Sequence, residues 1–205
     1  MFKFPKIQII KFLIFFILII PIKTSFGEDI EESANLEIKQ FKTECLKGDA
    51  EGCNTAASIL FSFERYKEAF ELFKIGCEKL NNSVSCYNVG DFFINGYGNL
   101  PKDEKKAIYY FKKACELSVK NHEDYCGGCY SLGTIFLIKS NPKKAVKYFS
   151  LDCSKNCCEA CFEIENMYRQ NLISKTSFLS IKSKNKNTFE TCDFLKKFSD
   201  DNIEE

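Results

Sequence analysis

The sequence predicts an all-α fold, a solenoid of helix–turn–helix repeats in which each repeat is held by a disulfide. A signature of alanine, three residues, phenylalanine, three residues and cysteine recurs at residues 69–77, 107–115 and 145–153. Its four-residue spacing places the three side chains on one helical face, and the copies begin 38 residues apart. A second cysteine follows each copy, at Cys86, Cys129 and Cys161, and a less regular copy begins at Cys45 and Cys53.

The predicted elements follow in order along the chain. A capping helix is expected at residues 35–46, because Leu36, Ile38 and Phe41 form a partial apolar stripe. It precedes four repeats, at about 50–80, 83–118, 126–154 and 157–198. The helices of the first two repeats are expected at 50–63, 66–80, 83–94 and 103–118.

Breaking and capping residues mark the helix ends in the second and third repeats. Glycine and proline within residues 95–101 prevent the preceding helix from continuing. Asp103 is the expected N-cap of the next helix, which ends before an insertion at 119–125. The third repeat has helices at 126–138 and 142–151, and the second of these begins with Asn141 as cap and Pro142 at its first position.

The fourth repeat is the least regular of the series. A helix is predicted at 157–169, a loop or frayed segment rich in serine, lysine and asparagine at 172–187, and a degenerate last helix at 188–198. Residues 199–205 are expected to form a disordered acidic tail. No strand-type alternation persists along the chain, so no sheet is expected.

The first 27 residues have the pattern of a secretory signal peptide. Lys3, Lys6 and Lys11 flank a continuous apolar run at residues 12–20, and small residues precede a cleavage point near Gly27. The run is shorter than the roughly 20 apolar residues that a bilayer span requires. We therefore expect a secreted or periplasmic protein with no stable membrane anchor after cleavage.

Cysteine content and charge restrict the function further. All twelve cysteines follow the predicted leader, and an even number in an exported chain predicts a disulfide framework. The leader contains four lysines and no acids, so the remainder has 25 basic and 28 acidic residues. This mild, unpatterned charge favours neither nucleic acid nor an anionic membrane as a partner. No glycine-rich phosphate loop occurs, and no cofactor or metal is expected.

The segment at residues 96–117, GYGNLPKDEKKAIYYFKKACEL, resembles the Sel1-like repeat family. The resemblance covers about residues 45–169, strongly in the second repeat, well in the third, and partly in the first and fourth. The additional cysteine pair in each repeat is similar to that of the secreted cysteine-rich proteins first described from Helicobacter. The resemblance implies a right-handed solenoid like that of tetratricopeptide repeats.

The same resemblance implies a disulfide pairing. In that family a cystine joins the end of one repeat's second helix to the start of the next repeat, which here implies Cys45–Cys53, Cys77–Cys86, Cys115–Cys129 and Cys153–Cys161. Helices joined by a tight turn bring residues about eight apart within bridging distance, which agrees with this pairing. The partners of Cys126, Cys157, Cys158 and Cys192 stay open, with Cys157 and Cys158 as alternative partners for Cys192.

Two other chemical roles compete for these cysteines. Cys126 and Cys129 have the spacing of a redox dithiol, but a thioredoxin-like site requires a βαβ context. Joined with Cys158 and Cys161, they could form a tetrathiolate zinc site. The 28 intervening residues exceed the usual spacing, and zinc would remove a partner from two repeat cystines, so disulfides are preferred.

The resemblance also implies a weak β-lactamase or penicillin-binding activity, with a β-lactam or peptidoglycan-derived ligand, but the residues do not support it. Ser140 with Lys143, and Ser183 with Lys186, match the bare Ser-x-x-Lys spacing. No Ser-Asp-Asn motif occurs, and residues 175–177 only approach the third motif. A metallo-β-lactamase needs several histidines, whereas His122 is the only one, so the catalytic residues are unknown.

The function expected first is the binding of proteins or peptides. Stacked helix pairs curve and leave a concave surface lined by the first helix of each pair. Asn54, Asn88, Ser131 and Glu163 follow the second cysteine of each repeat by one or two positions, and the amides suit peptide main chain. A third role is that of a cysteine-rich assembly factor of the kind found in the mitochondrial intermembrane space, although the leader lacks arginine.

Overall fold

The computed structural model of the protein describes residues 30–123 and 125–201. The predicted signal peptide at 1–27 and residues 202–205 of the predicted tail lie outside the described residues. The described part contains helices and connecting turns and no β-strand. No helix within it is long and apolar enough to cross a membrane.

The helices form consecutive antiparallel pairs. A helix at residues 30–46 precedes the pairs. A short 3₁₀ turn, η1 (Tyr97–Asn99), lies between the two helices of the second pair. The pairs are α2 (Ala50–Ser62) with α3 (Tyr66–Glu78), α4 (Ser83–Asn95) with α5 (Glu104–Lys120), and α6 (Gly128–Ile138) with α7 (Pro142–Cys153). The C-terminal part consists of α8 (Cys158–Arg169), α9 (Lys175–Lys184) and α10 (Lys186–Asp201).

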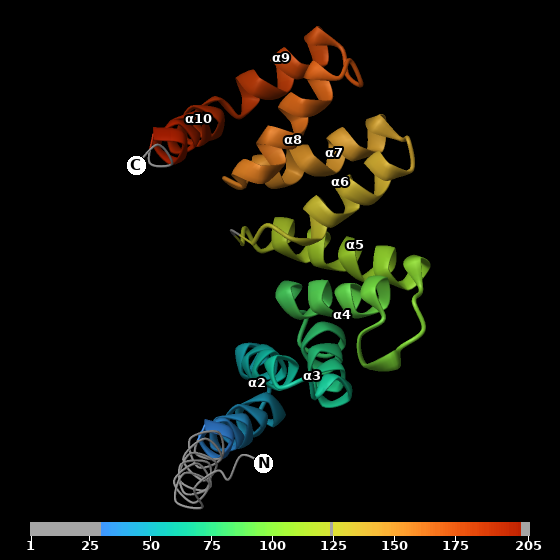
Figure 1. The fold of residues 1–205 in the computed structure, drawn as a ribbon, viewed down its shortest axis with the longest axis vertical. Coiled ribbons are helices and arrows are strands. Elements are labelled where there is room, and N and C mark those ends of the chain that lie inside the picture. Colours follow the sequence, from blue (N-terminus) through green and yellow to red (C-terminus); the bar gives the residue numbers. More distant parts are fainter. Residues whose placement is uncertain (1–29, 124, 202–205) are drawn as a thin grey trace, which may run out of the picture.

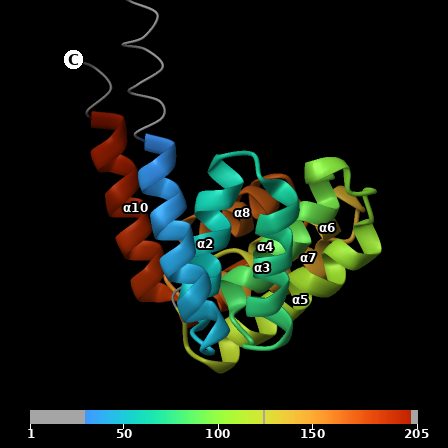
Figure 2. The same ribbon diagram turned by 90° about the horizontal axis from the view of Figure 1, so that it is seen from below.

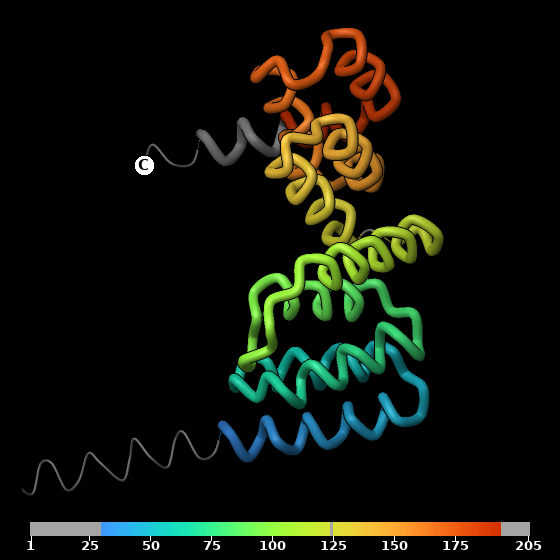
Figure 3. The backbone as a smooth tube through the Cα atoms, turned by 90° about the vertical axis from the view of Figure 1, so that its right-hand side faces the viewer, coloured from blue at the N-terminus to red at the C-terminus, as the bar shows by residue number. Residues whose placement is uncertain are grey.

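The pairs stack into an elongated molecule. From α2 to α8, each helix packs mainly against its neighbours in the chain, whereas α10 packs mainly against α8. Figure 1 shows the pairs succeeding one another from residue 30 to α10. Figure 3 shows the same order from the side, whereas Figure 2 looks along the stack and superimposes its two ends. Stacked repeats in which each repeat contacts mainly its neighbours are characteristic of a solenoid.

Capping side chains set the starts of α2, α4, α5, α7 and α9. Asp49, Asn82, Asp103, Asn141 and Ser174 each precede a helix, and the side chain of each accepts a hydrogen bond from a backbone N–H in the first turn. These bonds satisfy donors that have no partner within the helix. The two caps expected from the sequence, Asp103 and Asn141, are confirmed.

The repeated alanine and phenylalanine build the core. Ala107, Ala145 and Phe149 are fully buried, and Phe111 is nearly so. These two phenylalanines pack on glycines in the first helix of their own repeats, Phe111 on Gly90 and Phe149 on Gly133. A Cβ atom at Gly133 would lie only 2.6 Å from the Phe149 ring. The signature therefore joins the two helices of one repeat through a large ring seated where a side chain is missing.

A buried ion pair fixes the insertion that precedes α6. Asp152 is fully buried, and its Oδ1 lies 2.8 Å from Nζ of Lys155. Lys155 also donates to Ser118 Oγ and to the backbone oxygen of Tyr125. The second carboxylate oxygen, Asp152 Oδ2, accepts the backbone N–H of Tyr130 at 2.7 Å. Since no cap side chain precedes α6, Asp152 supplies from α7 the acceptor that the start of α6 needs.

The C-terminal part differs from the sequence-based expectation in two places. Residues 172–187 contain α9 rather than a loop, and Ser174 is its N-cap. Phe178 is 8% exposed and its ring stacks on Tyr168 at a centroid distance of 4.6 Å, which anchors this polar helix. The last helix, α10, continues to Asp201, so the first residues of the predicted disordered tail are helical.

Candidate binding surface

A disulfide framework connects the helix pairs. The structure pairs all twelve cysteines, and all of them lie in its described part. The four pairs implied by the family resemblance are present, with Cα–Cα distances from 4.5 to 4.9 Å: Cys45–Cys53, Cys77–Cys86, Cys115–Cys129 and Cys153–Cys161. Each closes a turn that leads into α2, α4, α6 or α8, so the orientation of successive pairs is covalently restricted.

The remaining four cysteines form two longer-range links. Cys126 pairs with Cys157 at a Cα–Cα distance of 5.8 Å, and Cys158 pairs with Cys192 at 5.3 Å. The first link joins the insertion to the start of α8, and the second joins α8 to α10. Cys126, Cys129, Cys158 and Cys161 are all bonded in disulfides. Neither the zinc site nor the redox dithiol considered from the sequence therefore forms in this structure.

The four candidate peptide-binding residues lie on the first helices of the pairs, α2, α4, α6 and α8, and all are half-buried. Asn88 Nδ2 donates to Asn54 Oδ1 at 3.4 Å, so these two amides contact each other. Ser131 hydrogen-bonds with the phenol of Tyr87. Glu163 lies near Tyr130, where its charge acts after burial to raise the pKa of that phenol. The structure therefore brings Asn54 and Asn88 into contact and places Ser131 and Glu163 each beside a tyrosine.

A groove of about 390 Å³ lies between α4 and α6, with α5 behind it. Its volume is within the range of about 300–1,000 Å³ that is usual for ligand pockets. Tyrosines, isoleucines and one phenylalanine make up most of the lining, and Asp91, Glu104 and Lys139 supply the charged groups. The lining consists of Tyr87, Asp91, Ile94, Glu104, Phe111, Tyr130, Ser131, Thr134, Ile135, Ile138 and Lys139.

Asp91 is the unusual ionisable group of this groove. It accepts a hydrogen bond from Asn95 Nδ2 at 2.8 Å, and no lysine or arginine of the described residues forms an ion pair with it. Burial raises the pKa of its carboxyl group, and the Asn95 bond opposes that shift. At the other end of the groove, Glu104 and Lys139 form an ion pair with each other.

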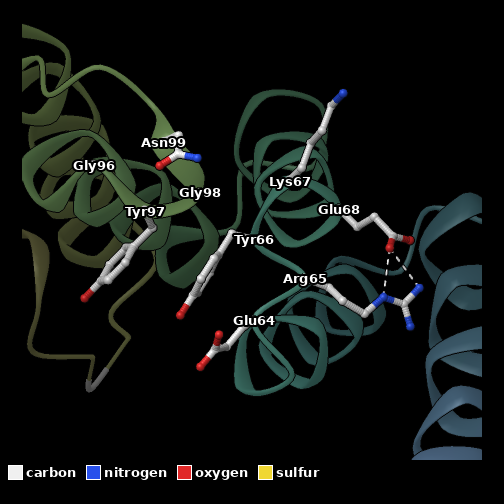
Figure 4. A pocket seen from close by; sticks show the side chains of 9 residues that line it. All are labelled: Glu64, Arg65, Tyr66, Lys67, Glu68, Gly96, Tyr97, Gly98 and Asn99. Atoms are coloured by element: carbon white, nitrogen blue, oxygen red, sulfur yellow. Dashed lines mark hydrogen bonds and ion pairs between the residues drawn. The ribbon is translucent and has the colours of Figure 1, made fainter.

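A second cavity, of about 690 Å³, lies beside the turn between α2 and α3 (Figure 4). The rings of Tyr66 and Tyr97 stack there at a centroid distance of 5.7 Å, and Figure 4 shows Lys67 pointing away from them. Arg65 and Lys42 hydrogen-bond to Glu68 and lower the pKa of its carboxyl group to about 2. Glu68 of this cavity is thus already paired with cations, unlike Asp91.

The residues considered for β-lactam chemistry lie outside both cavities. Ser140 is exposed in a turn between α6 and α7, with a φ of 53°, and its N–H donates to the backbone oxygen of Leu137. His122 lies in another turn after the end of α5. A serine nucleophile needs a base and an oxyanion site within hydrogen-bond reach. Neither Ser140 nor His122 lines either cavity.

Comparison with known proteins identifies the repeat. The family model described as the Sel1 repeat matches residues 83–119 and 125–154, which are the α4–α5 and α6–α7 pairs. The chain contains Sel1 repeats. The two matched Sel1 repeats are also the two that provide the walls of the groove.

Curated relatives extend the match beyond these two Sel1 repeats. Cytochrome c oxidase assembly factor 7 of Xenopus tropicalis is 30% identical over 148 residues, which are 70% of this chain and 64% of that protein. The Homo sapiens protein of the same name is 27% identical over 154 residues, 71% and 63% of the two chains. The Sel1-repeat-containing protein YjcO of Escherichia coli (strain K12) is 29% identical over 128 residues, 58% and 56%. The chain spans less than two thirds of the length of these relatives.

The groove between the Sel1 repeats includes residues that the sequence did not single out. Tyr87 and Tyr130 each follow a repeat cysteine directly, and Asp91 lies four positions after Tyr87 on the same helical face. Ser131 is the sequence-predicted candidate that lines this groove. The missed signal was an aromatic residue at the same register of both repeats, followed by a polar residue one turn later.

Proposed function

We propose that this chain is a protein-binding scaffold with the role of an assembly factor, and that it holds a segment of another protein in the groove between α4 and α6. The groove carries the proposal. It combines an apolar lining with Asp91, Glu104 and Lys139 on a surface built by two stacked repeats. Contacts between successive repeats also run through the first helices, α2 to α4 and α4 to α6, as expected if those helices line the inner face of a curved stack.

The relatives favour assembly over catalysis. Several of them are named as assembly factors of cytochrome c oxidase, whereas the described geometry offers no support for a β-lactamase. An assembly factor needs a rigid surface that recognises a partner, and Sel1 repeats closed by disulfides supply such a surface. The finer resemblance to the secreted cysteine-rich subtype stays a prediction.

We propose an oxidising compartment as the place of action. Six disulfides link the described chain, and such bonds persist where thiols are not kept reduced. The predicted leader favours the secretory route, to a secreted or periplasmic location. Fractionation of cells that express the complete reading frame, with the thiol state measured in each fraction, tests this assignment against the mitochondrial intermembrane space.

Binding in the groove can be tested with two matched variants. Ile138 lines the groove and is 78% exposed, whereas Leu46 lies outside it and is 83% exposed. The oxidised protein would be used to select binders from a displayed library of random dodecapeptides. We expect Ile138→Glu to weaken binding of the selected peptides at least about tenfold, and Leu46→Glu to leave it unchanged. Equal binding by both variants would remove the groove as the site.

A further inference from the structure

We infer that the groove between α4 and α6 selects a partner segment that carries a lysine or arginine among apolar side chains, with Asp91 as the residue that receives the cation. This inference rests on the proposed function and names the chemistry of the partner. It follows from the placement of Asp91, from its unused acceptors, and from the charge of the residues that line the groove.

Asp91 lies between apolar and aromatic groups of the groove. On α4 it is four residues after Tyr87 and three before Ile94, so all three share one helical face. The opposite wall, on α6, presents Ile135 and Ile138. A segment bound here would therefore place apolar side chains against isoleucines and a long polar side chain beside the carboxylate.

The Asp91 carboxylate has capacity for a further partner. A carboxylate offers two oxygens and about four acceptor sites, and Asn95 supplies one hydrogen bond to it. The charge of Asp91 also acts on the phenols of Tyr87, Tyr97 and Tyr125, whose pKa values are raised by burial and by this charge. None of these phenols is a cation. A half-buried carboxylate attracts an ammonium or guanidinium group more strongly than an exposed one, because less water screens the pair.

Charge is distributed unequally between the two kinds of helix. The first helices of the pairs, α2, α4, α6 and α8, contain five acidic residues and one basic residue: Glu51, Asp91, Glu159, Glu163, Glu165 and Arg169. The second helices, α3, α5 and α7, contain ten lysines and six acidic residues. The groove itself is lined by Asp91 and by Glu104 and Lys139, which pair with each other. The charge that has no ionic partner among the described lining residues is therefore negative, which attracts a basic segment and repels an acidic one.

The test compares one carboxylate of the groove with one on a second helix. Asp91→Asn keeps an oxygen that can accept from Asn95, and Glu116→Gln on α5 removes an exposed charge outside the groove. The probe is the tightest dodecapeptide selected on the oxidised protein, together with the same peptide in which norleucine replaces its lysine or arginine. We expect Asp91→Asn to weaken the cationic peptide about tenfold or more and to leave the norleucine peptide unchanged. Glu116→Gln should alter neither.

The outcomes separate this inference from the proposed function. If the selected peptides lack a cation, or if Asp91→Asn leaves their binding unchanged while Ile138→Glu abolishes it, the groove binds peptides and the inference fails. If neither variant affects binding, the proposed function fails as well. Circular dichroism of each variant, with thermal unfolding, shows whether a loss of binding reflects a loss of fold.

Discussion

At the scale of single residues, Asp91 lowers the stability of the protein that contains it. Burial raises the pKa of its carboxyl group, so the folded state binds the proton more tightly than the unfolded state does. The free energy of unfolding therefore decreases as pH rises from the ordinary carboxyl pKa through the raised one. At a pH above the raised pKa, the charged form of Asp91 is therefore present at a cost in stability.

We therefore expect Asp91→Asn to stabilise the free protein at pH 7. The substitution removes the half-buried charge and keeps an acceptor for Asn95, so the Tm should rise. The Tm measured between pH 4 and pH 8 checks the sign, since the gain should shrink as pH falls. A variant with a lower Tm than the parent at pH 7 would contradict it.

Glu68 provides a control of opposite sign. Arg65 and Lys42 lower the pKa of its carboxyl group from 4.5 to about 2, so its contribution to stability is present above pH 4.5 and lost as pH falls towards 2. Its side chain is 45% exposed, and solvent screening keeps the effect small. Glu68→Gln should lower the Tm slightly at pH 7, whereas Asp91→Asn should raise it.

At the scale of elements, the contact between a glycine and a phenylalanine sets how closely two helices approach. We expect Gly133→Ala to destabilise the protein by about 1–3 kcal/mol, because the new Cβ would lie 2.6 Å from the Phe149 ring. At a solvent-exposed position of a helix, the same substitution would raise the free energy of unfolding by up to about 1 kcal/mol, because alanine has the higher helix propensity. Urea unfolding measures the difference, and Phe149→Leu in the same chain should restore part of the loss. A Gly133→Ala variant as stable as the parent would show that the contact is loose.

The disulfides offer a second comparison between elements. Chain-entropy arguments give about 2.6 kcal/mol for the turn closed by Cys77 and Cys86, and about 3.8 kcal/mol for the longer loop closed by Cys158 and Cys192. Replacing Cys158 and Cys192 by serine should therefore lower the free energy of unfolding more than replacing Cys77 and Cys86, although helix α10, which carries Cys192, lies at the end of the stack. Urea midpoints of the two double variants test the order, and the reverse order would show that helix packing outweighs loop length.

The elements also show what a sequence can and cannot predict. Ala107, Phe111 and Asp103 were placed correctly because a repeat period and a capping rule are local properties. The partner of Cys126 could not be chosen, since Cys157 is 31 residues away and two adjacent cysteines compete. Asp91 was missed for a related reason. A single acidic residue on a helix face is usually exposed to solvent. Asp91 is half-buried in a groove because α6 lies opposite α4.

At the scale of the whole molecule, the disulfides divide the chain into two parts. Four overlapping loops, 115–129, 126–157, 153–161 and 158–192, cover every peptide bond between Cys115 and Cys192. No such loop spans residues 54–76 or 87–114. The first two pairs are thus connected through single stretches of chain, and the remainder is cross-linked.

This division predicts different products from two cuts. Lys102 and Lys139 are exposed and lie in turns, the first outside every loop and the second inside one. A site for a sequence-specific protease would be inserted after each lysine in turn. We expect the oxidised protein cut after Lys102 to separate into two pieces on a non-reducing gel, and the protein cut after Lys139 to migrate as one. Separation of both would disprove the pairing of Cys126 with Cys157.

The same covalent map determines how the molecule responds to tension. The shortest bonded path from Cys115 to Cys192 crosses three disulfides and includes only residues 126–129 and 157–158, so a pull on the two ends cannot lengthen that part. Residues 54–76 and 87–114 can extend to a span of about 3.3–3.6 Å per residue. The groove lies across this boundary, with α4 on the extensible side and α6 on the fixed side. A load along the chain would therefore unwind one wall of the groove and leave the other in place, and it would release a segment held there as proposed.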